Sequence, residues 1–332
     1  MKYIVFSDLH AYLFSEFAKP DDKYINTRLA NIVNATEDIL KAARETSSTV
    51  LFAGDLFHSR GSVQTEVFNF IFKVFSEYQD VPVIMIRGNH DAVNNRLDSP
   101  SSIEPFAILP NVKLVTKLEH FTSGEDTITA VSYGDEHAEI KEFINDNPAD
   151  ILLVHLGIEG AKGAGVSTLE GPFTVGDMRP EENKVVLMGH YHRSQKFTDN
   201  MLYVGNPVAQ NFSDSGMKKG YYKFEIDNHE LKNLEFVDLG YPTFETATPS
   251  TIQDISKDSF VRLKASKEDI KRIEVNTDVP DNIRLDVEYE AVSETRININ
   301  TSDEPKDIAS SWAEEFMPEQ KSLILEQIEK VS

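Results

Sequence analysis

The spacing of apolar positions divides the first part of the chain into alternating strand-like and helix-like segments. Short continuous apolar runs predict buried strands, and apolar residues that repeat every three to four positions predict amphipathic helices. The predicted strands cover 2–7, 49–53, 82–86, 127–132, 150–154 and 184–188, and the predicted helices cover 25–46, 63–78 and 135–146. Strands that alternate with helices predict a layered α/β domain with a largely parallel sheet.

The pattern becomes strand-rich after residue 188 and changes again near Pro242. Two hairpins are predicted from paired strand-like segments joined by turn residues, at 195–198 with 201–204 and at 219–226 with 231–238. Beyond Pro242 the sequence predicts a strand at 259–265, a helix at 267–275 and a strand at 283–290. Two terminal helices are predicted to begin near Pro305 and at Pro318. We therefore expect three parts, an α/β domain at 1–242, a small α+β domain at 243–300 and a helical tail at 301–332.

Side chains that can bind metal ions stand directly after the predicted strands. They are Asp8, His10, Asp55, His58, Asn89, His90, Asp91, His155, His190 and His192. A single Asp or His at a strand end is usually a loop residue, but six of the nine histidines lie at these positions. Because ligands of α/β sheets bind beyond the carboxyl ends of the strands, this concentration indicates one shared site.

The local spacing of these residues also favours a metal site. The pairs Asp8-x-His10 and His190-x-His192 would place two side chains on one face of an extended segment. A glycine precedes Asp55, where the chain is expected to bend and approach other backbone closely.

The chemistry of the set points to two divalent ions. Imidazole, carboxylate and amide ligands without sulfur suit Mn, Fe or Zn. The ligands are too many for one ion, whereas two ions about 3.5–4 Å apart with Asp55 as the bridge would use them all. Two such ions with ionised Asp8 and Asp55 leave a charge of about +2, which suits a phosphate substrate and an activated water. His90 follows the ligand Asn89, so we expect it to act on the substrate, with Asp91 orienting its ring.

Composition sets limits on location and partners. The chain has 332 residues, no cysteine and a formal net charge of −22. The absence of cysteine excludes a disulfide framework and a thiolate metal site. The negative net charge argues against a broad basic surface for nucleic acid or membrane. The apolar start is interrupted by Asp8, and no apolar run approaches the about 20 residues needed to span a bilayer. We expect a cytoplasmic protein that does not bind membranes.

Taken together, these motifs resemble the five-part signature of the calcineurin-like metallophosphoesterases. The order and spacing match over residues 1–210. The resemblance implies a four-layer α/β/β/α sandwich with a small α+β capping domain and a helical tail. It also implies two metal ions, Mn²⁺ or Mg²⁺. The first would be held by Asp8, His10, Asp55 and His192, and the second by Asp55, Asn89, His155 and His190. His90 would be the catalytic histidine.

Within that superfamily, the segment Gly-Asp-Leu-Phe-His-Ser-Arg at 54–60 resembles DNA repair exonucleases of the SbcD type. This resemblance implies that His58 is a second catalytic histidine and that residues 203–212 help to shape the substrate face. It further implies DNA as substrate, DNA capping by residues 243–300, and a homodimer that joins an SMC-like ATPase in a heterotetramer. The shortness of the chain fits a compact, phage-type version of the exonuclease.

Two questions stay open at the level of sequence. The terminal helices carry apolar stripes, Ile308, Trp312, Phe316 and Ile324, Ile328, Val331, which indicate burial either in their own domain or against the ATPase. The function expected is a metal-dependent DNA exonuclease or endonuclease. The alternatives are a small-molecule phosphodiesterase or phosphatase, and a non-catalytic scaffold that brings the ATPase to DNA.

Overall fold

The computed structural model of the chain describes residues 1–163, 167–276, 279–288 and 304–329. Two compact units make up this structure, Met1–Asp286 and Val287–Ser332. The first unit contains the sheets and all of the residues singled out as metal ligands.

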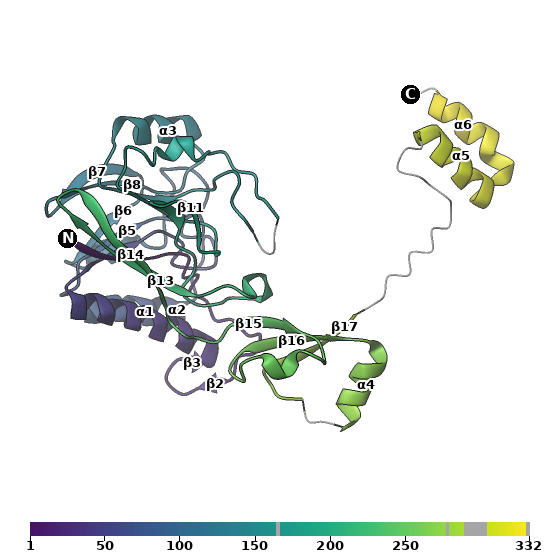
Figure 1. The fold of residues 1–332 in the computed structure, drawn as a ribbon, viewed down its shortest axis with the longest axis horizontal. Coiled ribbons are helices and arrows are strands. Elements are labelled where there is room, and N and C mark those ends of the chain that lie inside the picture. The colour runs from purple at the N-terminus through teal and green to yellow at the C-terminus, as the bar shows by residue number, and fades with distance from the viewer. Residues whose placement is uncertain (164–166, 277–278, 289–303, 330–332) are drawn as a thin grey trace. The chain divides into compact units, whose positions relative to one another are not determined.

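Two six-stranded mixed sheets form the centre of the first unit (Figure 1). The first sheet has the order β14-β13-β1-β4-β5-β6. Its strands are β1 (Lys2–Phe6), β4 (Thr49–Phe52), β5 (Val83–Ile86), β6 (Val112–Val115), β13 (Gly220–Asp227) and β14 (Glu230–Asp238). Strands β1, β4, β5 and β6 run parallel, whereas β13 and β14 add an antiparallel edge.

The second sheet has the order β11-β12-β10-β9-β8-β7. Its strands are β7 (Leu118–Ser123), β8 (Asp126–Val131), β9 (Ile151–His155), β10 (Val185–Gly189), β11 (Gln195–Thr198) and β12 (Met201–Tyr203). Strands β8, β9, β10 and β12 are parallel, and β7 and β11 pair antiparallel at the two edges. The expected parallel sheet is thus two sheets with parallel centres and antiparallel edges.

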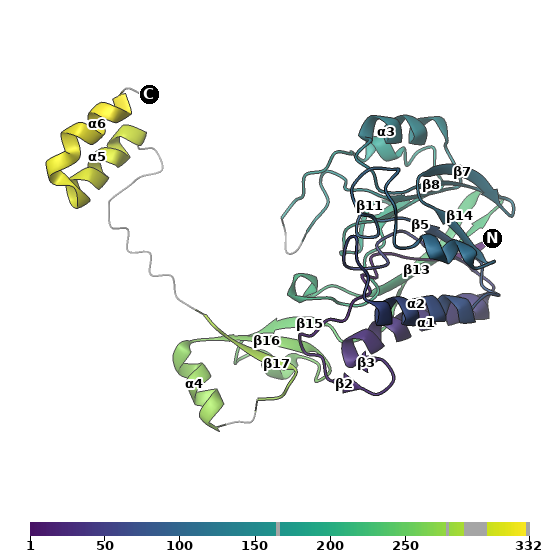
Figure 2. The ribbon, with the colours of Figure 1, turned by 180° about the vertical axis from the view of Figure 1, so that it is seen from behind.

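Helices cover the outer face of each sheet, so the first unit has four layers (Figures 1 and 2). Helices α1 (Thr27–Thr46) and α2 (Thr65–Glu77) pack on the first sheet, and α3 (His137–Asp146) packs on the second. In β1, Ile4 and Phe6 join the core under α1 and α2. The alternate residues Tyr3 and Val5 join the core between the two sheets. A strand that is apolar on both faces must be covered on both. Helices cover one face of β1 and the second sheet covers the other, so the predicted α/β/β/α sandwich is confirmed.

The ends of α1 follow from local chemistry. The side chain of Asn26 accepts a hydrogen bond of 2.8 Å from the Leu29 backbone N–H and so caps the first turn. At the other end Ser47 adopts a left-handed backbone with φ of 52°, which stops the helix.

The predicted strands and helices of the first 240 residues are present, with ends shifted by one or two residues. Strands β6 and β7 were missed because their sequences mix charged and apolar residues, as edge strands of a sheet often do. The structure also contains the short pair β2 (Pro20–Asp21) and β3 (Ile25–Asn26). Single 3₁₀ turns lie at Glu104–Ile108, Gly176–Met178, Phe212–Asp214, Ile252–Asp254 and Pro318–Gln320.

A small three-stranded sheet follows the layered part. It contains β15 (Phe244–Ala247), β16 (Phe260–Ala265) and β17 (Ile283–Val287), with helix α4 (Lys267–Asn276) between the last two strands. Strand β15 was not predicted, and part of the predicted strand 283–290 lies outside the described residues. The division at 242/243 and 300/301 and the DNA-capping role stay predictions.

Arg28 of α1 joins this small sheet to the layered part. Its guanidinium donates hydrogen bonds to the backbone oxygens of Ala209 and Gln210, at 3.4 and 2.7 Å. The same group lies over the rings of Phe244 and Phe260, 4.8 and 5.1 Å from their centroids. A buried arginine is tolerated here because carbonyl oxygens and aromatic faces compensate for lost water.

The second unit contains a pair of helices, α5 (Pro305–Phe316) and α6 (Lys321–Glu329). An ion pair of 2.7 Å joins Lys321 to Glu314 across the pair, and the Trp312 side chain is 42% exposed. The predicted helices are present, whereas residues 301–303 and Val331 of the predicted tail lie outside the described residues. Among the helices that the structure describes, none has both the length and the apolar character required to cross a membrane.

Candidate metal centre

The predicted ligands meet at one edge of the two sheets. Asp8 and His10 follow β1, Asp55 and His58 follow β4, and Asn89, His90 and Asp91 follow β5, all in the first sheet. His155 ends β9, and His190 and His192 follow β10 in the second sheet. Because the parallel strands of both sheets end on the same side, their loops bring these side chains together.

The backbone at the centre is unusual. Asp8, His10, Asp55 and His190 have φ values of 53°, 46°, 61° and 107°, in the region that residues with a Cβ rarely adopt. The expectation that Asp8-x-His10 and His190-x-His192 are extended segments is therefore wrong. Hydrogen bonds hold the turns, including one of 2.9 Å from the Asp8 N–H to the Gly54 oxygen. Backbone strain of this kind gathers at functional sites, where the surrounding structure maintains it.

Two glycines allow the loops to approach one another. A Cβ on Gly54 would lie 2.5 Å from Nδ1 of His155, and Gly54 also has a φ of 90°. A Cβ on Gly88 would collide with the carboxylate of Asp55. Any larger residue at either position would displace a predicted ligand, which explains glycine at both.

One group of donor atoms lies between the sheets. Oδ1 of Asn89 is 3.0 Å from Nε2 of His155 and 2.9 Å from Nδ1 of His190. Nδ1 of His155 lies 2.7 Å from the backbone oxygen of Ala53. A carbonyl oxygen only accepts, so Nδ1 of His155 carries a proton and Nε2 is the ring nitrogen that faces the centre.

A second group of donor atoms lies beside the first. Ligand atoms of Asp8, His10 and His192 all lie within 4.8 Å of one another. The carboxylate of Asp8 is held in place by the hydroxyl of Ser7 at 2.5 Å and by the backbone N–H of His190 at 3.0 Å.

Asp55 lies between the two groups. Its Oδ2 atom is 3.4 Å from Nε2 of His10 and 3.4 Å from Nε2 of His155. Its other oxygen accepts a hydrogen bond of 2.8 Å from the backbone N–H of His90. One carboxylate oxygen is thus equally close to a ligand atom of each group, which is the placement required of a bridge.

The centre also contains buried polar atoms without partners. Both ring nitrogens of His10 are buried and lack a hydrogen-bond partner among the described residues. Such groups are rare in native proteins and call for a ligand. Two divalent cations fit these donors, because they would give partners to the His10 nitrogens and bind the nitrogen and oxygen atoms gathered around them.

Burial and charge set the protonation states of the centre without metal: two imidazoles are neutral, and other donors carry protons that a bound cation would displace. Burial lowers the pKa of His10 well below its usual value and lowers that of His190 to about 3, so both rings are neutral. Burial opposes a charge on His155, but Asp55 outweighs it and raises the pKa of His155 to about 9. Burial raises the pKa of Asp8, with Asp55 adding to the effect. Closely packed carboxylates and imidazoles of this kind can exchange protons for cations.

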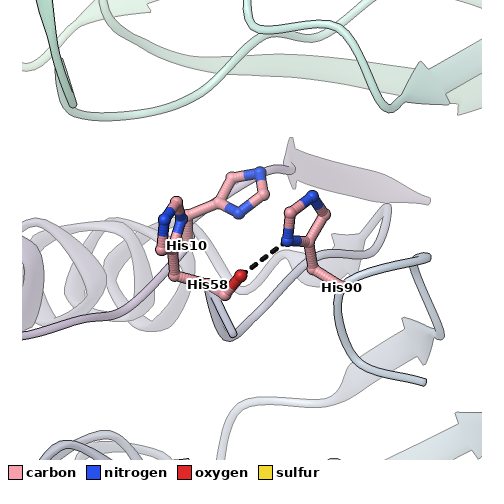
Figure 3. A group of neighbouring side chains, drawn as sticks. All are labelled: His10, His58 and His90. Atoms are coloured by element: carbon pink, nitrogen blue, oxygen red, sulfur yellow. Dashed lines mark hydrogen bonds between the residues drawn. The ribbon is translucent and has the colours of Figure 1, made fainter. Parts of the chain in front are cut away.

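His90 and His58 form the wall of the centre beside His10, and Figure 3 shows their three rings close together. Nδ1 of His90 lies 2.6 Å from the backbone oxygen of His58 and must therefore donate to it. Nε2 of His90 is thereby left for other partners. The His58 ring is half-buried and lies edge-on to His10 at 5.5 Å between centroids, and its pKa is lowered by burial.

Asp91 supports the loops beneath the centre. Its side chain was predicted to orient the His90 ring, but it forms no hydrogen bond with that ring among the described residues. Its oxygens instead accept from four backbone N–H groups at 2.9–3.1 Å, those of Asp55, Leu56, Phe57 and Gly88. Burial and the neighbouring Asp55 raise the pKa of Asp91 to about 7. One carboxyl group thus ties the loop after β4 to the loop after β5.

Replacing Asp91 by alanine is expected to lower the free energy of unfolding by about 3 kcal/mol or more. The change leaves four buried N–H groups without acceptors, whatever the charge state of the native carboxyl group. Urea unfolding in the presence of EDTA measures the loss without a contribution from metal binding. The exposed Asp98→Ala variant serves as control and should change stability by less than about 0.5 kcal/mol. Equal stabilities of the two variants would contradict this role of Asp91.

Sequence reasoning missed the support of His192. Oδ1 of the buried Asp214 lies 3.5 Å from Nδ1 of the partly exposed His192 and 2.9 Å from the ammonium group of the buried Lys219. Burial opposes ionisation of Asp214, but His192 and Lys219 lower its pKa below the usual range. Asp214 stands just beyond the segment 203–212 that was expected to shape the substrate face. The partners of Asp214 come from other segments, so the spacing of residues around Asp214 does not predict its role.

Comparison with known families decides the family. Residues 1–194 match the sequence model of the calcineurin-like phosphoesterases. The chain belongs to the calcineurin-like phosphoesterase family. The match ends after the segment that contains His190 and His192, so every predicted ligand of this phosphoesterase lies within it.

Individual proteins also resemble this phosphoesterase. It is 25% identical over 252 residues to the SbcD subunit of the nuclease SbcCD from Staphylococcus epidermidis. That alignment covers 66% of this chain and 64% of the relative's length. A solved structure, a dimetal phosphatase from Danio rerio, is similar with a TM-score of 0.42 and 10% identity, over 68% of this chain and 93% of that one.

Proposed function

We propose that this phosphoesterase hydrolyses DNA with two metal ions, as the nuclease component of an SbcCD-like complex. The observation that carries the proposal is the position of Asp55, whose Oδ2 is 3.4 Å from one imidazole nitrogen of each ligand group. The similarity to the SbcD subunit of the nuclease SbcCD supports DNA as the substrate. The chain covers 64% of that relative, so substrate and partners are part of the proposal.

The ligands divide into two sets that share one carboxylate. Asp8, His10, Asp55 and His192 would hold one ion, and Asp55, Asn89, His155 and His190 the other. Bound metal ions of this kind polarise the phosphate and lower the pKa of a bound water to about 7. Nitrogen and oxygen ligands are consistent with Mn²⁺, and Mg²⁺ is the second candidate. Which of the two the protein uses stays a prediction.

The chain's own residues would position the phosphate and supply protons. Nε2 of His90 is the nitrogen left for the substrate, because Nδ1 is bound to the His58 oxygen at 2.6 Å. From this position it would donate a hydrogen bond to a phosphate oxygen or a proton to the leaving oxygen. The His58 ring stands next to it, with centroids 5.8 Å apart.

The remaining parts of the proposal concern partners. An SMC-like ATPase would dock on α5 and α6, where Trp312 and Phe316 are each 42% exposed and their rings are 5.7 Å apart. A homodimer within a heterotetramer, a phage source and a cytoplasmic location stay predictions. So does a role for residues 243–300 in capping DNA.

Hydrolysis assays test the proposal against its alternatives. With Mn²⁺, the purified protein is expected to degrade labelled linear duplex or single-stranded DNA, and EDTA should abolish the reaction because it removes the ions that activate the water. Hydrolysis of bis(p-nitrophenyl) phosphate without any attack on DNA would instead support the small-molecule phosphodiesterase. Failure to hydrolyse either compound, with the ATPase partner added, would leave the scaffold role. The comparison should include His120→Ala, a surface histidine bonded to Thr129 outside the centre, as a matched control.

A further inference from the structure

A groove lined by basic residues leads away from the metal centre. It consists of two adjoining hollows that share Lys162 and Arg193 in their walls. The first hollow, of about 280 Å³, reaches the predicted ligands His190 and His192. The second, of about 520 Å³, continues to Lys218. A molecule that occupies both hollows would therefore touch the metal centre at one end.

The basic side chains of this groove are not neutralised by the protein. In the described part of the chain, Lys162, Arg193 and Lys218 form no ion pair with a carboxylate. Asp214 is the one carboxylate among the described lining residues, and it is paired with Lys219 at 2.9 Å. The groove is thus a local positive strip on a chain with a formal net charge of −22. Three uncompensated cations in one groove are stabilised when an anion binds between them.

The backbone of two of the basic residues is also held in place. The Lys162 N–H donates to Oε1 of Gln195 at 2.8 Å, and Nε2 of Gln195 donates back to the Lys162 oxygen at 3.0 Å. This reciprocal pair fixes the position of Lys162 beside β11. Arg193 directly follows the predicted ligand His192, so its backbone lies next to the metal centre. Its Nε atom is buried and has no hydrogen-bond partner among the described residues.

The far end of the groove is aromatic. Tyr222 and Phe236 line the second hollow, with ring centroids 5.2 Å apart. The hydroxyl of Tyr222 is bonded to Ser194 at 2.7 Å, which fixes its ring. Tyr222 is 6% exposed and Phe236 partly buried, so they form the apolar wall of the hollow, beside cations of the kind that contact successive phosphates of single-stranded nucleic acids.

We propose that Lys162, Arg193 and Lys218 bind the phosphodiester backbone of a single DNA strand and lead it to the metal centre. Hollows of about 280 and 520 Å³ have the size of small-ligand sites and so suit a few nucleotide units of one strand rather than a duplex. This inference rests on the proposed nuclease function and adds to it the residues that select a polymeric substrate. It also explains how so acidic a chain binds DNA, namely through one local basic strip.

A binding experiment on the full chain tests the groove. The affinity for a fluorescein-labelled oligothymidylate is measured by anisotropy over a series of salt concentrations, in EDTA so that hydrolysis does not enter the readout. The triple variant Lys162→Gln, Arg193→Gln, Lys218→Gln is expected to raise Kd at least about tenfold. It should also lower the slope of log Kd against log salt by about two, since each phosphate contact contributes about 0.7.

Two matched variants make the result specific. Lys41→Gln, Lys117→Gln, Lys184→Gln removes the same charge at exposed positions outside the groove, and Kd should then stay within about twofold of the native value. The charge-conserving variant Lys162→Arg, Arg193→Lys, Lys218→Arg should restore most of the affinity. An unchanged Kd in the groove variant, or an equal loss in both glutamine variants, would overturn the proposal.

The outcomes for the groove and for the proposed function can be separated. The ratio of kcat/KM for the oligonucleotide to that for bis(p-nitrophenyl) phosphate is expected to fall about tenfold or more in the groove variant. If the native protein binds DNA through the groove but hydrolyses none, the groove proposal holds and the nuclease proposal is wrong. If the native protein hydrolyses DNA, and the groove variant has the same kcat/KM ratio and the same Kd as the native protein, the nuclease proposal holds and the groove proposal is wrong.

Discussion

Replacing His90 by alanine is expected to lower kcat for DNA hydrolysis by about 10²–10⁴-fold while both metal ions remain bound. The His90 side chain does not belong to either ligand group, and its Nδ1 is already occupied by the His58 oxygen at 2.6 Å. Only Nε2 is left to act on the substrate, and alanine removes it. Because the expected interaction forms chiefly in the transition state, kcat should fall much more than KM rises.

The measurement pairs single-turnover hydrolysis of labelled DNA with metal analysis of the same protein. His120→Ala controls for the loss of a histidine, and it should retain the native rate. A His90→Ala variant that hydrolyses DNA within about threefold of the native rate would exclude a catalytic role for His90. A variant that loses metal as well would place His90 among the ligands instead.

Replacing Asp55 by asparagine is expected to abolish both hydrolysis and the stabilisation that metal binding provides. Asp55 is the carboxylate placed between the two ligand groups, and an amide removes the negative charge that two cations need close by. Metal at a hundred times its Kd stabilises a protein by about 2.7 kcal/mol, which corresponds to a rise in Tm on the order of 5 °C for a chain of this size. EDTA should therefore lower the Tm of the native protein by that amount and leave the Tm of Asp55→Asn unchanged.

Thermal unfolding with and without EDTA measures this difference directly. The suitable control is Asp177→Asn, a partly buried carboxylate that accepts a hydrogen bond of 2.7 Å from the Thr174 N–H outside the centre. Its stability can fall, but its response to EDTA should equal that of the native protein. A full response to EDTA in Asp55→Asn would show that the metal ions bind without this carboxylate.

The ligands were predictable because their chemistry is distinctive and local. Imidazole and carboxylate groups directly after apolar strands have few structural reasons to occur together, and the rule that parallel strands end on one side predicted their convergence. The φ values of Asp8 and His190 were not predictable, since the two-residue spacing is equally consistent with an extended chain. The left-handed turns depend on contacts between the loops.

Features that depend on distant segments were missed. Asp214 supports His192 through atoms brought together from separate loops, and neither its neighbours nor its spacing distinguish it from a surface carboxylate. Strands β6 and β7 lack a continuous apolar run, so only their pairing in the sheets identifies them. The groove could not be predicted either, because Lys162, Arg193 and Lys218 come from separate segments. In the sequence the two lysines resemble ordinary surface residues, and only the fold places them beside Arg193.

Hydrolysis by the proposed two-metal centre requires that two cations bind side by side and share Asp55. Crystals soaked in manganese and measured at the manganese absorption edge test this requirement most directly. We expect two anomalous peaks about 3.5–4 Å apart, both within bonding distance of the Asp55 carboxylate. A single peak, or two peaks without Asp55 between them, would contradict the two-metal centre.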